Sequence, residues 1–327
     1  MPESEVVTMP GCPTHSRGRR TTWLRTIQSW FDSSAATNSS GANDIAWLRV
    51  LPFIALHAAC ISVMFVGVSS IALIAAGVLY AVRMFAVTAF YHRYFAHRAF
   101  RTSRVLQFVF AVIAATSVQR GPLWWAAHHR NHHLHADAPG DPHSPKLRGF
   151  FWSHMGWFLT PAGFNTDWRR IPDLARYPEL RWLDRFDIVA PVALAAGLYG
   201  LGAYLQQYAP QLNTSGAQLL VWGFCISTVV LFHATVTINS LAHRFGTRRF
   251  ATVDASRNNF WLALLTFGEG WHNNHHYYPC SARQGFRWWE IDVTYYGLRL
   301  MAMCGLVSNL KPVPARVLLL RIRPACE

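Results

Sequence analysis

Two long apolar stretches dominate the pattern of hydrophobic and polar positions along this chain. Between residues 50 and 91 the only charged residue is Arg83, and between residues 188 and 243 there is no Asp, Glu, Lys or Arg. Each stretch holds two helices of about 20 residues, the length that crosses a bilayer. Short turns near residues 67–70 and 206–213 divide them. The pattern predicts four transmembrane helices in two hairpins, at about 48–91 and 188–243.

Two shorter apolar segments, residues 105–118 and 291–307, complete the helical pattern. The first, of about 14 residues, is too short to span the hydrocarbon core, and the second carries two charged residues. We therefore expect both segments to lie at the membrane interface, the second with Asp292 and Arg299 on its polar side. Arg83 is costly in contact with lipid, so it should face the protein interior or reach toward an edge of the membrane.

Composition supports a membrane protein and argues against a nucleic-acid partner. Charged residues make up only 14% of the chain, whereas soluble proteins carry roughly 25%. The formal net charge of +14 is not arranged in a nucleic-acid motif, and it suits contact with an anionic lipid surface. Residues 1–45 are rich in Ser, Thr, Gly and Asn and are expected to form a basic, largely disordered tail. Residues 46–327 would form the membrane domain.

The distribution of basic residues predicts the topology. Lys and Arg occur before the first hairpin, between the hairpins and after the second, while neither hairpin turn carries any. By the positive-inside rule, both termini and the segments 92–187 and 244–327 lie in the cytoplasm. This places every histidine-rich motif on one face of the membrane.

Three histidine clusters lie in these cytoplasmic segments or at the ends of the predicted helices. The i, i+3, i+4 spacing occurs twice and places three imidazoles on one face of a helix. A five-residue step on an α-helix turns side chains by about 140°, so the remaining pair should approach different ions. The candidate ligands are His92 and His97; His129, His132 and His133; and His272, His275 and His276.

Eight clustered histidines exceed what one ion uses, so the sequence predicts two transition-metal ions. His243 is a ninth candidate, and Asn239, four residues earlier, could hold a bridging water. Ligating histidines need partners on their second ring nitrogen, and the candidates are Glu269, Asp137, Asp141 and Asp254. His57 and His233 are interpreted as hydrogen-bonded interior residues, and His128 is left open. The surface or supporting histidines are His15, His135, His143 and His154.

The motifs resemble those of the membrane fatty acid desaturases, specifically the Δ9 acyl-CoA and acyl-lipid branch. The likeness spans roughly residues 47–310 and includes HRYFAHR, HRNHH, NSLAHRFG and GEGWHNNHH. It implies an all-α fold with a four-helix membrane stem and a cytosolic cap. It also implies a di-iron centre held by the nine histidines named above, with Asn239 contacting iron through water.

The resemblance implies an O2-dependent reaction that introduces a cis double bond, at Δ9 by this branch, into a saturated acyl chain. Two electrons must come from a separate protein, because the sequence has no GxGxxG, haem or iron–sulfur motif. A basic cytosolic face suits an acidic donor such as ferredoxin or cytochrome b5. A bent apolar tunnel is expected, lined by the cap and the second and fourth helices.

One departure concerns the acyl carrier. The animal acyl-CoA enzymes have an Arg-Asp pair before the second histidine motif, where this chain has Ala127 and His128. That favours an acyl lipid over acyl-CoA as the substrate. Alternative functions are a di-iron alkyl or acyl hydroxylase on the same scaffold, a membrane metal transporter and a zinc hydrolase. A transporter would place its ligands in mid-membrane, and a hydrolase would need a dedicated base.

Overall fold

The computed structural model describes residues 17–35 and 44–319 and is built from helices. Strand pairing among these residues is limited to isolated bridges such as that between Arg101 and Ser308. The all-α fold class is therefore confirmed.

Four helices in the described part of the chain are long and apolar enough to cross a membrane, as the sequence predicted. Several consist of consecutive α, 3-10 or π segments. The first comprises α2 (Trp47–Ala59), η2 (Cys60–Ser62) and α3 (Val63–Val66). The second comprises α4 (Ser70–Phe85) and the π-helix η3 (Ala86–Ala96). The third is α11 (Val189–Tyr208), and the fourth comprises α12 (Gly216–Gln218), the π-helix η8 (Leu219–Ile226) and α13 (Ser227–Ser240).

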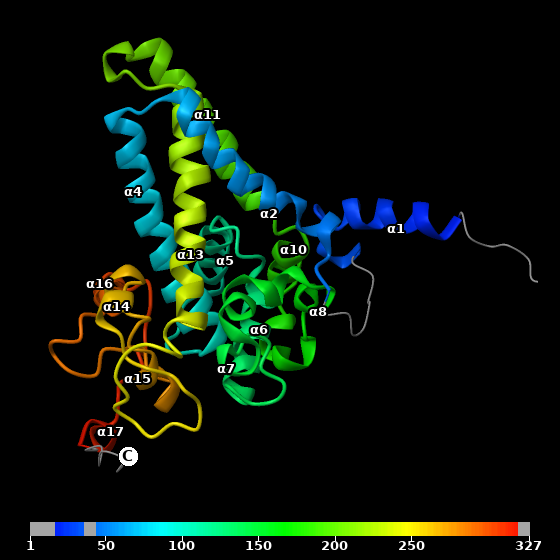
Figure 1. Ribbon diagram of the computed structural model, residues 1–327. Helices are drawn as coiled ribbons and strands as arrows, with labels where there is room; N and C mark the ends of the chain where they lie inside the picture. The colour runs from blue at the N-terminus through cyan, green and yellow to red at the C-terminus, as the bar shows by residue number, and fades with distance from the viewer. Residues whose placement is uncertain (1–16, 36–43, 320–327) are drawn as a thin grey trace, which may run out of the picture.

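The two hairpins pack against each other, and their turns lie at the same end. α4 and α13 run side by side, while α2 and α11 slant away from them toward the cap (Figure 1). Ser69 caps α4 by accepting a hydrogen bond from the Ala72 N–H, and its hydroxyl donates to Thr214 of the second turn at 2.9 Å. At the same end, the indole N–H of Trp222 donates a hydrogen bond to the Gly67 carbonyl of the first turn.

Arg83 lies inside the helix bundle, as expected for a cation in a spanning segment. Its side chain is 1% exposed and makes five hydrogen bonds to neutral oxygen atoms. The acceptors are the carbonyls of Leu79, Thr116 and Gly223 and the hydroxyls of Ser227 and Thr228. The guanidinium therefore joins the second and fourth spanning helices.

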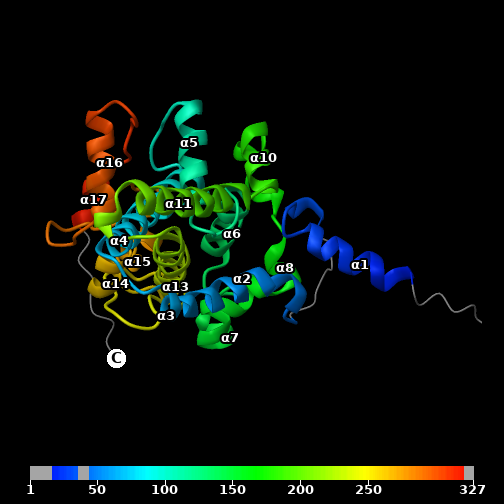
Figure 2. The same cartoon turned by 90° about the horizontal axis from the view of Figure 1, so that it is seen from above.

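The shorter helices of the cap lie crosswise to the spanning helices. Seen from above, α4 and α13 are viewed nearly end-on, whereas α5 (Arg104–Ala115) and α16 (Val293–Met303) lie in the plane of the picture (Figure 2). Asp292 is not on a polar face of α16, contrary to expectation. It is fully buried at the helix N-terminus, where it pairs with Arg93 and accepts from the Tyr295 N–H.

Part of the expected disordered tail is helical. α1 covers Arg17–Gln28, and a 3-10 turn follows at Ser33–Ala35. Asp32 anchors this segment through hydrogen bonds of 2.9 and 2.7 Å from Arg185 of α10 (Pro178–Arg185). The prediction of a largely disordered tail is thus wrong for these residues, and residues 1–16 and 36–43 lie outside the described part.

Candidate metal centre

The second spanning helix presents His92 and His97 together because its last turns are π-helical. The His97 N–H donates to the His92 carbonyl at 3.1 Å, a bond between residues five apart. The wider π turn brings residues i and i+5 closer to one face of the helix, whereas an α-helix would separate them by about 140°. The two ring centroids lie 4.8 Å apart. The expectation that this pair approaches different ions is therefore wrong.

α6 (Pro122–His135) carries the second histidine motif, and a buried carboxylate fixes its start. Asp184 Oδ1 accepts hydrogen bonds from the N–H groups of Leu123 and Trp124, both at 2.9 Å. These donors have no partner within the first helical turn, so the contact stabilises the helix. Gly121 is needed here because a Cβ atom on it would lie 2.2 Å from the same oxygen.

α15 (His272–Tyr277) carries the third motif, and its two asparagines bind it to the rest of the cap. Asn273 Oδ1 accepts from the N–H groups of Arg249 and Phe250 at 2.8 and 2.7 Å. Asn274 donates to Glu290 at 3.0 Å. Both asparagines are fully buried, so this short helix depends on side-chain contacts for its position.

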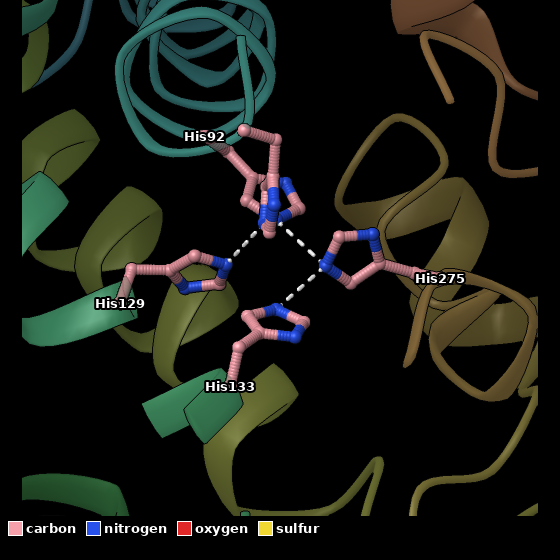
Figure 3. Close-up of side chains that lie close together, drawn as sticks. His92, His129, His133 and His275 are labelled. Atoms are coloured by element: carbon pink, nitrogen blue, oxygen red, sulfur yellow. Dashed lines mark hydrogen bonds between the residues drawn. The ribbon is translucent and has the colours of Figure 1, made fainter. Parts of the chain in front are cut away.

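The histidines form two groups, which we call cluster A and cluster B. Cluster A contains five histidines whose nearest ring nitrogens all lie within 4.8 Å of one another: His92, His97, His129, His133 and His275. Their Nε2 atoms face each other, at 2.8 Å between His97 and His129 and 2.9 Å between His275 and His133. The rings converge from η3, α6 and α15 (Figure 3).

Cluster B contains four histidines within the same limit: His132, His243, His272 and His276. The Nε2 atoms of His243 and His272 are 3.0 Å apart. His276 Nε2 is buried and has no hydrogen-bond partner among the described residues. The i, i+3, i+4 motifs therefore supply both clusters, since α6 gives one histidine to cluster B and α15 gives two.

Each of the four carboxylate candidates contacts the Nδ1 atom of a different histidine. Glu269 lies 2.5 Å from His92, and Asp137 lies 2.8 Å from His243. Asp141 contacts His132 at 3.1 Å, and Asp254 contacts His276 at 3.0 Å. A carboxylate on Nδ1 holds the proton there and leaves the Nε2 lone pair free to bind a metal. The sequence alone did not rank these four acids.

Burial keeps most of these imidazoles neutral. It lowers the pKa values of His97, His129, His133, His272 and His275 well below the ordinary value, and the neighbouring histidines lower them further. Burial also lowers the pKa of His276 to about 4, against the opposing effect of Asp254. The His243 partner lowers the pKa of Asp137 despite its burial. Neutral imidazole is the form that binds a transition metal.

Converging neutral imidazoles fit transition-metal ions better than any other common ligand. The set contains nitrogen donors only, which iron, copper, zinc and nickel accept and which magnesium and calcium do not favour. The partnerless Nε2 atom of His276 and the facing Nε2 atoms of cluster A have no other evident function. The described residues thus form two adjacent groups that could each hold one ion.

An apolar cavity of about 410 Å³ runs beside the histidines. The first, third and fourth spanning helices line it, through residues such as Phe53, Val192 and Phe232, and His129 of cluster A is part of its wall. The expected contribution of the fourth helix is therefore present. The second helix does not contribute to the lining, and the first and third take its place.

The remaining histidines lie outside both clusters. His57 and His233 are hydrogen-bonded to each other at 3.2 Å, in agreement with the sequence interpretation, and His154 bonds to His233 at 3.0 Å. His135 is hydrogen-bonded through Nδ1 to the Asn131 carbonyl of its own helix, and His15 is outside the described residues. Two others, His128 and His143, line the cavity.

His128 donates from Nε2 to the Asn165 carbonyl at 3.0 Å, and burial lowers its pKa to about 4. His143 lies 3.8 Å from Asp141, so it borders cluster B as a supporting residue. Asn239 also lines the cavity, and its water-mediated contact with a metal stays a prediction.

Four apolar helices above a histidine-rich cap define a membrane protein whose buried imidazoles could bind metal. Residues 69–301 match the family model described as fatty acid desaturase. The chain is 38% identical over 229 residues to an sn-2 palmitoyl-lipid 9-desaturase of Nostoc sp. (strain 36), covering 68% of this chain and 75% of that protein.

The chain is also 34% identical over 270 residues to an sn-1 stearoyl-lipid 9-desaturase of Anabaena variabilis, covering 82% of this chain and 94% of that protein. It is also 36% identical over 303 residues to an acyl-CoA 5-desaturase of Anemone leveillei, covering 89% of each. The chain belongs to the fatty acid desaturase family and is therefore an oxidoreductase.

Proposed function

We propose that this protein is an O2-dependent, di-iron acyl-lipid desaturase that introduces a cis double bond at Δ9. The observation that carries the proposal is the position of cluster A beside an apolar cavity, because His129 belongs to both. The relatives named as lipid 9-desaturases support the position of the double bond and the lipid carrier.

The nine histidines would hold two iron ions, with Asn239 in contact through water. Iron supplies the oxidising power toward dioxygen and unactivated methylene groups that no side chain provides. The protein excludes water and holds the acyl chain in register with the centre. Aromatic side chains of the cavity wall, among them Phe53, Trp157 and Phe232, suit contact with a hydrocarbon chain.

The carrier is proposed to be a glycerolipid. Ala127 and His128 occupy the positions of the Arg-Asp pair of the animal acyl-CoA enzymes, and neither offers a charge here. His128 is half-buried and, with its pKa lowered to about 4, neutral near pH 7. Arg49 and Arg120 also line the cavity, close to the ends of the spanning helices, where a lipid headgroup would lie.

Electrons are proposed to come from a separate acidic carrier of the ferredoxin or cytochrome b5 type. The net charge of +14 favours encounter with such a partner. The proposed topology places both termini and the active site on the cytoplasmic side, where these donors would be available.

The test is the fatty-acid profile of cells expressing the full chain. Monounsaturated fatty acids with a cis bond at Δ9 are expected, with a mass two hydrogens below the saturated precursor. A product heavier by one oxygen would instead identify the hydroxylase alternative. Conversion of labelled phospholipid without CoA would support the lipid carrier, and strict dependence on CoA would contradict it.

Two ligand variants and one matched control link the activity to the clusters. His132→Ala and His275→Ala are expected to abolish the new double bond, because each removes a nitrogen from a different cluster. His135→Ala, on the same helix as His132 but outside both clusters, should retain the activity. Retained desaturation in both ligand variants would remove these histidines from the centre.

A further inference from the structure

The two histidine clusters differ in the carboxylates that support them. In cluster B, three of the four histidines have a carboxylate on Nδ1: Asp137, Asp141 and Asp254. In cluster A, only one of the five does, through the contact of His92 with Glu269. These counts refer to the described residues, which include all nine histidines.

A basic side chain partly offsets the charge of the single carboxylate beside cluster A. Arg93, which is 1% exposed, donates to Glu269 Oε1 from Nη2 at 3.1 Å and from Nε at 3.3 Å. Arg93 also pairs with Asp292 at 2.9 Å, so these three side chains together carry one net negative charge. Cluster A therefore has five donors with little negative charge behind them.

The three carboxylates beside cluster B have only histidines and neutral groups as partners among the described residues. Asp137 accepts from the Ser144 hydroxyl and the Ala255 N–H, both neutral groups. Asp141 accepts from the backbone N–H groups of Asp137 and His143, and Asp254 accepts from that of Ser256. No Lys or Arg side chain of the described residues forms an ion pair with any of the three. The negative charges beside cluster B are therefore not offset by a basic side chain.

We infer that the two metal positions are unequal and that cluster B binds its ion first and more tightly. A divalent cation gains more from three nearby negative charges than from one, and the gain is large where water is excluded. Carboxylate partners also raise the basicity of the ligating imidazoles, and losing one partner typically lowers metal affinity about 10- to 100-fold. Cluster B has fewer nitrogen donors than cluster A, but more of its imidazoles are made more basic by a carboxylate.

The cavity supports a division of roles between the two positions. Its wall includes His129 of cluster A and none of the four histidines of cluster B. Cluster B is also deeply buried, with His132, His243 and His272 between 2% and 4% exposed. An ion held by cluster B would therefore be enclosed by protein, whereas an ion held by cluster A would lie beside the cavity proposed for the acyl chain. The inference rests on the proposed dimetal centre and specifies how it is filled.

The experiment is anaerobic titration of the full-length, metal-free protein in detergent with 57Fe(II). Bound iron is counted by mass spectrometry, and the sites are distinguished by Mössbauer spectroscopy. The wild type should bind two ions in steps that differ at least 10-fold in affinity. At one equivalent of iron, one quadrupole doublet should dominate, and a second should appear only as the second equivalent is added.

Two variants assign the first site. Asp254→Asn should weaken the first binding step about 10- to 100-fold and alter the doublet seen at one equivalent. Glu269→Gln should weaken only the second step and leave that doublet unchanged. Asp141→Asn provides a second cluster B variant if Asp254→Asn does not fold. Asp167→Asn, at a half-buried acid that pairs with Arg169, should leave both steps unchanged.

Two results would overturn the inference while leaving the proposed function intact. One is equal intensity of both doublets at one equivalent of iron in the wild type, which would show equal affinities. The other is a first doublet altered by Glu269→Gln and not by the cluster B variants, which would place the tighter site at cluster A. Absence of any stoichiometric iron binding would overturn the inference and the dimetal centre together.

Discussion

At the scale of single residues, two arrangements of buried charge distinguish the clusters from the spanning helices. The carboxylates beside the clusters pair with histidines, whereas Arg83 has no ion-pair partner among the described residues and is satisfied by neutral oxygens. The gathering of the histidines could be predicted because their i, i+3, i+4 spacing repeats along the sequence. Their carboxylate partners could not be ranked, since Asp137 and His243 are 106 residues apart and no local pattern links them.

Arg83→Lys is predicted to destabilise the protein by about 3 kcal/mol or more. An ammonium group has three donors and cannot replace the five hydrogen bonds of the guanidinium, and each bond to a charged group contributes about 1.5–3 kcal/mol. Thermal and denaturant unfolding in one detergent would measure the loss. Arg169→Lys, at a side chain that is 89% exposed, should change stability by less than about 0.5 kcal/mol. Equal effects of the two substitutions would contradict the proposed function of Arg83 as an interhelical contact.

At the scale of elements, the apolar pattern predicted the spanning helices but not their local geometry. The boundaries Trp47–Val66, Ser70–Ala96, Val189–Tyr208 and Gly216–Ser240 follow the predicted hairpins closely, since length and hydropathy determine them. The π-helical turns of η3 could not be anticipated, because the apolar pattern there does not distinguish a π from an α turn. That single difference changes the position of His97 relative to His92.

Gly202→Ala is predicted to separate the two helices of the second hairpin. A Cβ atom at Gly202 of α11 would lie 2.4 Å from the Ser215 carbonyl oxygen and 2.7 Å from Gly216 Cα, and backbone atoms cannot move aside cheaply. The apparent melting temperature in detergent should fall. Gly200→Ala, two residues earlier on the same helix, has no atom within 4 Å of the added Cβ. It should leave the melting temperature unchanged or raise it, since alanine favours a helix by about 1 kcal/mol over glycine. Similar behaviour of both variants would argue against close packing at this crossing.

At the scale of the whole molecule, the histidine clusters lie at one end of the spanning helices and the two hairpin turns lie at the other. All nine histidines of the clusters lie in or next to the cap, while the two turns meet at the opposite end through Ser69 and Thr214. Arg98 and Arg130, from different histidine motifs, both pair with Asp173, so these motifs lie on the same side. This arrangement was expected from the distribution of Lys and Arg, because a single metal centre requires that its motifs share one face of the membrane.

The proposed topology predicts opposite labelling of the two ends of the molecule. In a cysteine-free background, Gln211→Cys places a thiol in the second hairpin turn, and Val253→Cys places one in the cap at a position that is fully exposed. A membrane-impermeant maleimide should label the turn variant in intact cells and the cap variant only after permeabilisation, because the proposed topology puts the cap in the cytoplasm. Folded protein should be confirmed by retained desaturation for each variant. Labelling of both thiols from outside would show that the cap is not cytoplasmic, and the donors proposed for the reaction would then have no access to it.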